Sequence, residues 1–116
     1  CWDDVPAAEV AVYTLLEAAS EKLRCILQRL QCRDFYDLYV LLSVERVDRQ
    51  EAVELFRRKA RHLDLNPDTF GDRYELQIPR YKARWADELG NYMREVPPFI
   101  EVERRVKQVL RQANLL

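Results

Sequence analysis

Five polar residues in the first third of the chain have the types and the spacing that chemistry would need. Glu21 and Lys22 are adjacent, and Arg33, Asp34 and Asp37 follow in a second short stretch. On a helix, residues three or four apart share one face, so Asp37 can meet both Arg33 and Asp34. An aspartate at a helix start can also accept hydrogen bonds from the first backbone amides, which makes Asp34 a candidate cap. The spacing therefore predicts one polar cluster on one helix face.

Lys22 has two possible roles, one structural and one functional. It lies three residues after Ala19 and four before Ile26, beside an apolar stripe, so its stem is expected to be buried while its ammonium group contacts Asp34 or Asp37. Spacing alone favours an ionic lock between helices, in which the cations and the two carboxylates satisfy one another. In the functional alternative, a desolvated lysine acts as a base through a lowered pKa, or binds phosphate as a point charge.

The elements that must position these residues are predicted from caps and apolar periodicity. Thr14 and Glu17 form a capping box, which predicts a helix that begins at about Leu15 and runs to about Gln31. Its inner face carries apolar residues at helical spacing, namely Leu16, Ala19, Leu23, Ile26, Leu27 and Leu30. Ahead of it, residues 9–13 would place Val10 and Val12 on one side of an extended chain and Ala11 and Tyr13 on the other, which predicts a short strand. Residues 34–42 are dense in large apolar side chains and predict a central helix.

The rest of the chain is punctuated by further helix signals. Asp48 and Glu51 repeat the capping box and predict a third helix that ends near Leu63. Asn66 before Pro67 predicts the start of a short helix or turn.

The last third of the chain is expected to hold two helices. Pro79 is expected at the first turn of a helix that stops at Gly90. A final helix is predicted from the apolar spacing of Phe99, Val102, Val106, Val109, Leu110 and Ala113. The predicted fold class is all-α, a bundle-like single domain of five or six helices over residues 1–116 with a short N-terminal strand.

Composition supports one helical domain and excludes several classes of protein. The chain has 116 residues with 48% hydrophobic and 34% charged residues, and it holds only 2 Gly and 5 Pro. Its formal net charge of -1 gives no global attraction for a polyanion. Cys1, Cys25, Cys32 and the single His62 lack zinc-ligand spacing. With free thiols and no apolar run long enough for a signal peptide or a membrane span, the expected location is the cytoplasm, without membrane contact.

Two stretches of the sequence resemble a known family. The segment from Val12-Tyr13-Thr14 to Glu21-Lys22-Leu23, followed by Arg33-Asp34-Phe35-Tyr36-Asp37-Leu38-Tyr39, resembles the later conserved block of the AbiEii-type toxins. The resemblance covers about residues 10 to 42. Members of this family look like minimal nucleotidyltransferases, in which an N-terminal mixed sheet with a Gly-Ser turn and paired aspartates holds Mg²⁺ and a nucleoside triphosphate. They act as toxins of type IV toxin-antitoxin and phage-abortive systems.

The resemblance also implies roles for individual residues. The lysine of the family's E-K-L element falls on Lys22, and its R-D-x-x-D element falls on Arg33, Asp34 and Asp37. Catalytic roles are thereby implied for Lys22, Asp34 and Asp37, and nucleotide-binding or supporting roles for Arg33 and Glu21. The relative weight of the two aspartates stays open.

The chain departs from the family pattern in the residues that would hold phosphate and metal. Gly71 and Gly90 are its only glycines, and neither is followed by Ser. Asp3 and Asp4 are adjacent, so in a strand they would point to opposite faces and could not share a magnesium ion. We therefore expect the C-terminal half of a nucleotidyltransferase-like fold, inactive alone and without a cofactor of its own, in a protein that extends upstream.

The family implies three partners: an upstream nucleotidyltransferase domain of the same protein, an RNA acceptor and a cognate antitoxin. It implies Mg²⁺ and a nucleoside triphosphate as cofactors of the full-length protein. The alternative function is a noncatalytic helical interaction or dimerisation module, in which the Arg-Asp-Lys cluster is purely structural. The oligomeric state is left open.

A basic run and the aromatic residues complete the candidates. The run is Arg57, Arg58, Lys59, Arg61 and His62, and it could touch RNA. The favoured interpretation is structural, because cations late in a helix interact favourably with its dipole. The aromatic residues, including Trp2 and Trp85, are predicted to serve helix packing rather than base stacking.

Overall fold

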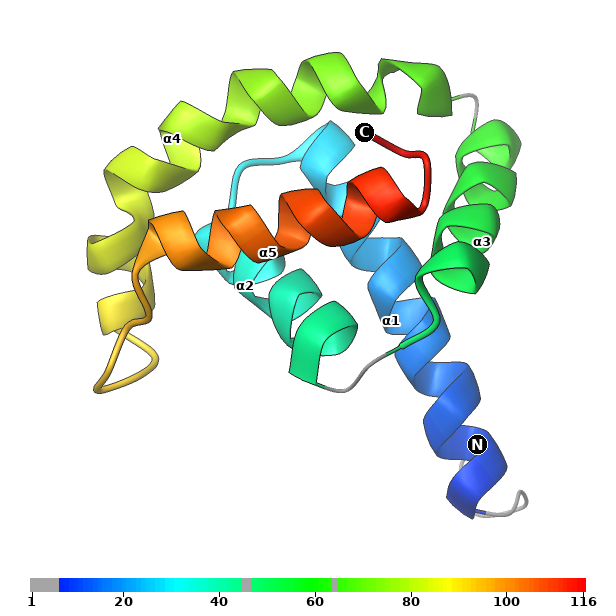
Figure 1. Cartoon of the computed structure of the whole chain (residues 1–116), viewed down its shortest axis with the longest axis horizontal. Helices are drawn as coiled ribbons and strands as arrows, with labels where there is room; N and C mark the ends of the chain where they lie inside the picture. The colour runs from blue at the N-terminus through cyan, green and yellow to red at the C-terminus, as the bar shows by residue number, and fades with distance from the viewer. Residues whose placement is uncertain (1–6, 45–46, 64) are drawn as a thin grey trace.

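Every regular element that the structure describes is helical. The structure is a computed structural model that describes residues 7–44, 47–63 and 65–116, with side chains from residue 15 onward (Figure 1). The α-helices are α1 (Ala7–Gln28), α2 (Cys32–Tyr39), α3 (Arg49–His62), α4 (Phe70–Gly90) and α5 (Phe99–Gln112). A π-helical turn, η2 (Val40–Val44), extends α2, and a 3-10 turn, η3 (Pro67–Thr69), precedes α4. The predicted all-α class is confirmed for the described residues.

The prediction for the N-terminal segment is wrong in two respects, because α1 begins earlier than expected. It begins at Ala7, so residues 9–13 are helical and not a strand, and Thr14 lies inside the helix and not at its start. Residues 7–28 contain neither Gly nor Pro but five alanines, and alanine has the highest helix propensity. A five-residue alternation also lacks a partner strand, and an isolated strand is not stable in water.

The middle of the chain follows the predicted caps. Asp48 Oδ1 accepts the Glu51 backbone N–H at 3.0 Å, as the capping box predicts, and α3 ends at His62, next to the expected end near Leu63. Asn66 Oδ1 accepts the Asp68 backbone N–H at 2.9 Å and starts η3. These caps are local interactions within three residues, and they are correctly predicted.

α4 corrects the expectation for Pro79. The proline lies inside one continuous helix rather than at the first turn of a new one. A buried stripe at helical spacing runs through both halves of α4, namely Phe70, Tyr74, Gln77, Tyr81, Trp85 and Leu89. Packing of this stripe outweighs the hydrogen bond that proline cannot donate. Figure 1 shows α4 curved over the other helices, as an interior proline favours.

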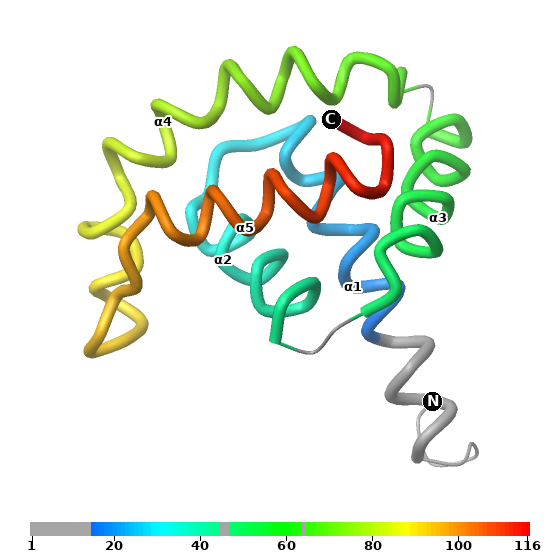
Figure 2. Tube along the Cα trace, viewed as in Figure 1, coloured from blue at the N-terminus to red at the C-terminus, as the bar shows by residue number. Residues whose placement is uncertain are grey.

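The core is centred on α2, which contacts α1, α4 and α5 (Figure 2). Phe35 of α2 is fully buried, and its ring lies 5.0 Å from the ring of Tyr81 and 5.8 Å from that of Phe99, centroid to centroid. Trp85 packs edge-on against Phe35, and its indole N–H donates to the Pro97 carbonyl at 2.8 Å. Trp85 is thus a packing residue, as predicted, whereas Trp2 lies outside the described residues.

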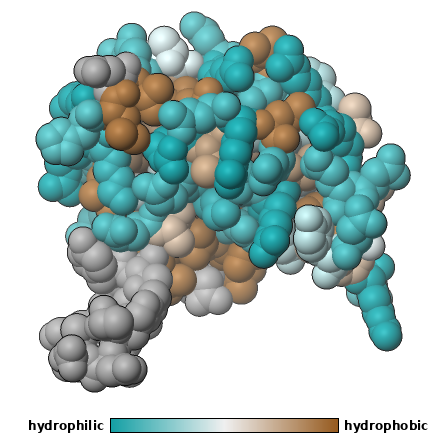
Figure 3. Space-filling view, turned by 180° about the vertical axis from the view of Figure 1, so that it is seen from behind, coloured by the Kyte–Doolittle hydropathy of each residue, from teal (hydrophilic) through white to brown (hydrophobic). Residues whose placement is uncertain are grey.

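The exposed apolar side chains are distributed over several elements. The large ones that are at least 47% exposed are Val44, Leu63, Leu76, Tyr92 and Ile100. In Figure 3, hydrophilic side chains cover much of the rear face and apolar ones form separate patches between them. No helix in the described part of the chain is long and apolar enough to cross a membrane.

Candidate functional site

Lys22 and the two aspartates of the predicted cluster lie together where α1 packs against α2. Lys22 is in the second half of α1, and only three residues separate α1 from α2, so the start of α2 returns beside it. Lys22 Nζ lies 3.0 Å from Asp34 Oδ1 and 3.2 Å from Asp37 Oδ2. The side chains are 24% exposed for Lys22, 3% for Asp34 and 36% for Asp37. One ammonium group is therefore held between a buried carboxylate and a solvent-facing one.

Arg29 is a further member of this cluster, and it was missed from the sequence. Its Nε donates to Asp34 Oδ2 at 2.8 Å, and its Nη2 donates to Asp34 Oδ1 at 3.1 Å. This is the paired geometry in which a guanidinium binds a carboxylate most strongly. A signal was available, because Arg29 follows Lys22 by seven residues, which is two turns on the same helix face.

Arg33 and Glu21 do not join Lys22. The Arg33 guanidinium carbon lies 5.1 Å from the centroid of the Tyr92 ring, a cation–π contact on another side of α2. Glu21 accepts from Arg24 Nε at 3.0 Å and from Lys59 Nζ at 3.4 Å. The prediction that Arg33 shares one polar cluster with Asp34 and Asp37 is therefore wrong. Neighbours on a helix point about 100° apart, so Glu21 and Arg33 face away from Lys22 and Asp34.

The charges of this cluster stabilise one another. Burial raises the pKa of Asp34, but hydrogen bonds and charge from Arg29 and Lys22 outweigh it, and its pKa lies below the ordinary value. Burial lowers the pKa of Lys22, but its contacts with Asp34 and Asp37 outweigh that effect and raise its pKa. Both groups are thus charged at neutral pH. A protonated Lys22 fits the binding of an anion better than it fits the role of a base.

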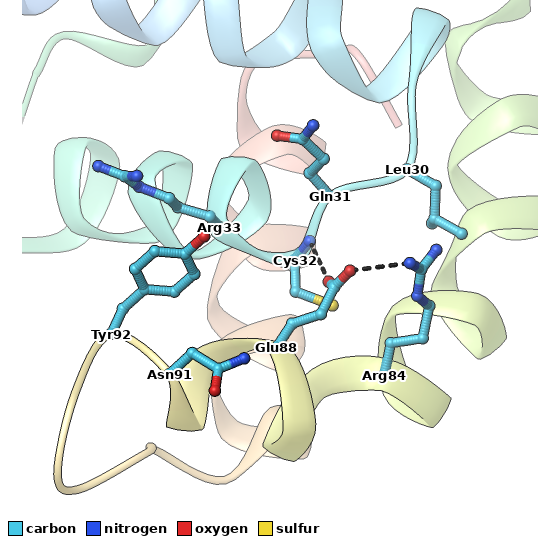
Figure 4. Close-up of a pocket in the computed structure, with 8 residues that line it drawn as sticks. All are labelled: Leu30, Gln31, Cys32, Arg33, Arg84, Glu88, Asn91 and Tyr92. Atoms are coloured by element: carbon cyan, nitrogen blue, oxygen red, sulfur yellow. Dashed lines mark hydrogen bonds and ion pairs between the residues drawn. The ribbon is translucent and has the colours of Figure 1, made fainter.

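The start of α2 is capped by another helix and not by Asp34. The Glu88 carboxylate of α4 accepts the Cys32 backbone N–H at 3.0 Å and pairs with Arg84 at 3.0 Å (Figure 4). The expectation that Asp34 caps this helix is wrong, because both of its oxygens are bonded to Lys22 and Arg29.

A polar pocket lies beside this cap. Its volume is about 340 Å³, and it is lined by Leu30, Gln31, Cys32, Arg33, Arg84, Glu88, Asn91 and Tyr92. Figure 4 shows the Arg33 and Tyr92 side chains next to each other at one end of this pocket and the Arg84–Glu88 pair at the other.

Comparison with known proteins assigns the family. The family described as Nucleotidyl transferase AbiEii toxin, Type IV TA system, matches residues 1–112. The chain belongs to the AbiEii family. No curated protein and no solved structure shows significant similarity to it. The match extends the resemblance seen over residues 10 to 42 to nearly the whole sequence, so the helices after α2 are part of the family pattern too.

Family membership raises the question of where magnesium would bind. Within the described residues, no group of three His, Cys, Asp or Glu side chains is arranged to hold a metal ion. Asp34 is a poor ligand because its oxygens already accept from Arg29 and Lys22. The residues described here therefore do not fit the Mg²⁺ that the AbiEii resemblance implies. Asp3 and Asp4 lie outside the described residues.

The basic run on α3 is partly engaged in structural contacts. Lys59 pairs with Glu17 at 3.6 Å and with Glu21 at 3.4 Å, both on α1. Arg57 donates to the Asn114 carbonyl at 3.0 Å. Two of the five basic residues thus connect α3 to α1 and to the C-terminus, which supports the structural interpretation.

The thiols of Cys25 and Cys32 are free and buried.

Proposed function

We propose that this AbiEii chain contributes Lys22 to a nucleotide-transfer site, where the ammonium group binds phosphate oxygens and Asp34 and Asp37 orient it. The observation that carries the proposal is the position of Lys22 Nζ, within 3.2 Å of both carboxylates and still partly open to solvent. An ammonium group has three N–H donors. One of them donates to the buried Asp34, and the ammonium group pairs with the more exposed Asp37 on its other side, so a phosphate oxygen can reach Lys22 from solvent.

A fixed cation is useful in phosphoryl and nucleotidyl transfer because negative charge spreads over the phosphate oxygens in the transition state. Lys22 is held by Asp34 from the buried side, so little reorganisation is needed when a phosphate arrives. Its raised pKa keeps it protonated through the neutral range. These properties support a role as a phosphate-binding point charge.

The remaining parts of the site are proposed to come from the nucleotidyltransferase domain that AbiEii proteins carry. The chain's two glycines lie in or at the end of α4, so neither belongs to a phosphate-binding turn. We therefore place binding of the triphosphate and of Mg²⁺ on that domain, and we take an RNA as the acceptor and a cognate antitoxin as the regulating partner. Activity then requires both domains.

The test is nucleotide transfer by the full-length protein with labelled nucleoside triphosphates and RNA. Lys22→Ala is expected to lower the rate about 100-fold, the cost of removing one fixed donor to a developing negative charge. The matched control is Lys59→Ala, because Lys59 also lies on the helical domain and also pairs with two carboxylates. A control that loses as much activity as Lys22→Ala, with both variants folded, would overturn the proposal.

A second candidate function is a noncatalytic helical interaction module. It is favoured by the burial of Asp34, whose two oxygens are both bonded inside the chain. A double-mutant cycle between Lys22 and Asp34 discriminates the two functions. Strong coupling in stability, together with no transfer activity in the intact gene product, supports the module.

A further inference from the structure

We infer that the two aspartates of the Lys22 cluster have different tasks: Arg29 fixes Asp34 as a permanent anchor of Lys22, and Asp37 is the exchangeable partner that an incoming phosphate displaces. The inference rests on the proposed function, since it assigns the parts of the same site. It makes Arg29 a positioning residue that acts on Lys22 through Asp34.

Asp34 is built to stay in place. Its carboxylate is almost fully buried and accepts three hydrogen bonds, two from Arg29 and one from Lys22. Removing a buried carboxylate from such partners leaves uncompensated charge, which is costly. Oδ1 is shared by both cations, so the Arg29 fork also sets the direction from which Asp34 receives Lys22. Asp34 is therefore the fixed end of the Lys22 contact.

Asp37 is held much less firmly. Its side chain is 36% exposed, and its described contact is the ion pair with Lys22 at 3.2 Å. An ion pair of this exposure contributes little, because water can solvate both groups when it opens. Asp37 is the more exposed of the two partners of Lys22, so a phosphate oxygen that arrives from solvent competes with Asp37 rather than with Asp34. A dianion can therefore take the place of Asp37 while Asp34 keeps its hydrogen bonds.

Arg29 cannot be replaced by lysine in this arrangement. It donates from Nε and Nη2 to different oxygens of one carboxylate, a fork that a single ammonium group cannot reproduce. Its side chain is 51% exposed, so it adds little to the core. Loss of the fork is therefore expected to change the position of Asp34 and Lys22 more than the overall fold.

Inorganic pyrophosphate and lysine side-chain NMR test the inference directly. The chain holds four lysines, Lys22, Lys59, Lys82 and Lys107, so each ¹³Cε signal can be assigned by substitution. Titration of the full chain with pyrophosphate is expected to shift the Lys22 signal. Asp37→Asn is expected to tighten the apparent Kd about fivefold, because a weak surface ion pair no longer competes. Glu17→Gln is the matched control, because Glu17 is a carboxylate of α1 that pairs with Lys59 and not with Lys22, and this variant should leave the Lys22 titration unchanged.

The Arg29 variants separate positioning from charge. Arg29→Ala and Arg29→Lys are both expected to weaken pyrophosphate binding at Lys22, by about tenfold for a lost charged hydrogen-bond pair. If Arg29→Lys binds like wild type, Arg29 acts only through its charge and the inference is wrong. Equal affinities of Asp37→Asn and wild type would also overturn it. Pyrophosphate binding can be measured without a transfer reaction. A full-length protein that shows the expected affinities but transfers no nucleotide would therefore contradict the proposed function and leave this inference standing.

Discussion

Two clusters that involve α1 each pair one lysine with two carboxylates, and they differ in how firmly those carboxylates are held. Lys22 and Lys59 are similarly exposed, at 24% and 28% of the side chain, and each contacts two carboxylates. The partners of Lys22 lie at 3.0 and 3.2 Å, and one of them is buried and held by Arg29. The partners of Lys59 lie at 3.4 and 3.6 Å, and both are about 40% exposed.

The difference shows that counting ion pairs does not locate a binding site. Both Glu17 and Glu21 can move with Lys59 on the surface, so that cluster has little preference for one geometry. Asp34 cannot move in this way, because its carboxylate is enclosed and bonded from two directions. A cation held from its buried side is preorganised for a ligand on its open side. The buried anchor, and not the number of charges, distinguishes the Lys22 cluster.

Removal of the anchor is expected to give the larger loss of stability. Asp34→Asn replaces a carboxylate that accepts three charged hydrogen bonds, and we expect it to lower the free energy of unfolding by about 2 kcal/mol. Glu21→Gln in the Lys59 cluster should cost less than about 0.5 kcal/mol. Urea denaturation followed by circular dichroism measures both. Equal losses for the two variants would remove the distinction between the clusters.

The pH dependence of stability gives a second contrast. Burial raises the pKa of Asp34, but Arg29 and Lys22 lower it by more, so the folded pKa lies below the unfolded value of about 3.9. The contribution of Asp34 to the free energy of unfolding is therefore complete above about pH 3.9 and is lost as the pH falls through the folded pKa. The pKa of Lys22 is raised overall, so its stabilisation holds below about 10.4 and is lost as pH rises through the higher folded value.

The measurement is the difference in unfolding free energy between wild type and Asp34→Asn from acid to alkaline pH. We expect a plateau between about pH 5 and pH 9, with a decline on both sides. A difference for Asp34→Asn that is independent of pH would show that its charged contacts contribute nothing.

The sequence predicted those parts of the site that depend on local spacing. Lys22 borders the apolar stripe of α1 and Asp34 and Asp37 lie one turn apart, so their approach follows from helix geometry and a short connection. The caps of α3 and η3 are equally local and were predicted correctly. Arg29 was missed although the predicted helix extended to about Gln31, which placed Arg29 two turns after Lys22 on the same face.

Features that depend on distant segments could not be predicted. Glu88 caps α2 from 56 residues away, and no local pattern links it to Cys32. Pro79 indicates a helix start by its local preference, but the buried residues on both sides of it keep α4 continuous. The alternation in residues 9–13 indicated a strand, yet a strand requires a partner, and helix propensity decided the outcome. Tertiary packing and pairing thus overrode local signals at these three places.

The smallest expected difference between the two clusters is the effect of salt on the coupling energy of each lysine–carboxylate pair. Double-mutant cycles give the coupling energy of Lys22 with Asp34 and of Lys59 with Glu21, each in low salt and in 1 M NaCl. The Lys59–Glu21 coupling is expected to be about 0.5 kcal/mol and to vanish in 1 M NaCl, where the Debye length is about 3 Å. The Lys22–Asp34 coupling should keep more than about half of its value, because ions cannot enter between an ammonium group and a buried carboxylate. If salt abolished both couplings equally, Asp34 would be hydrated in solution and could not serve as the anchor of Lys22.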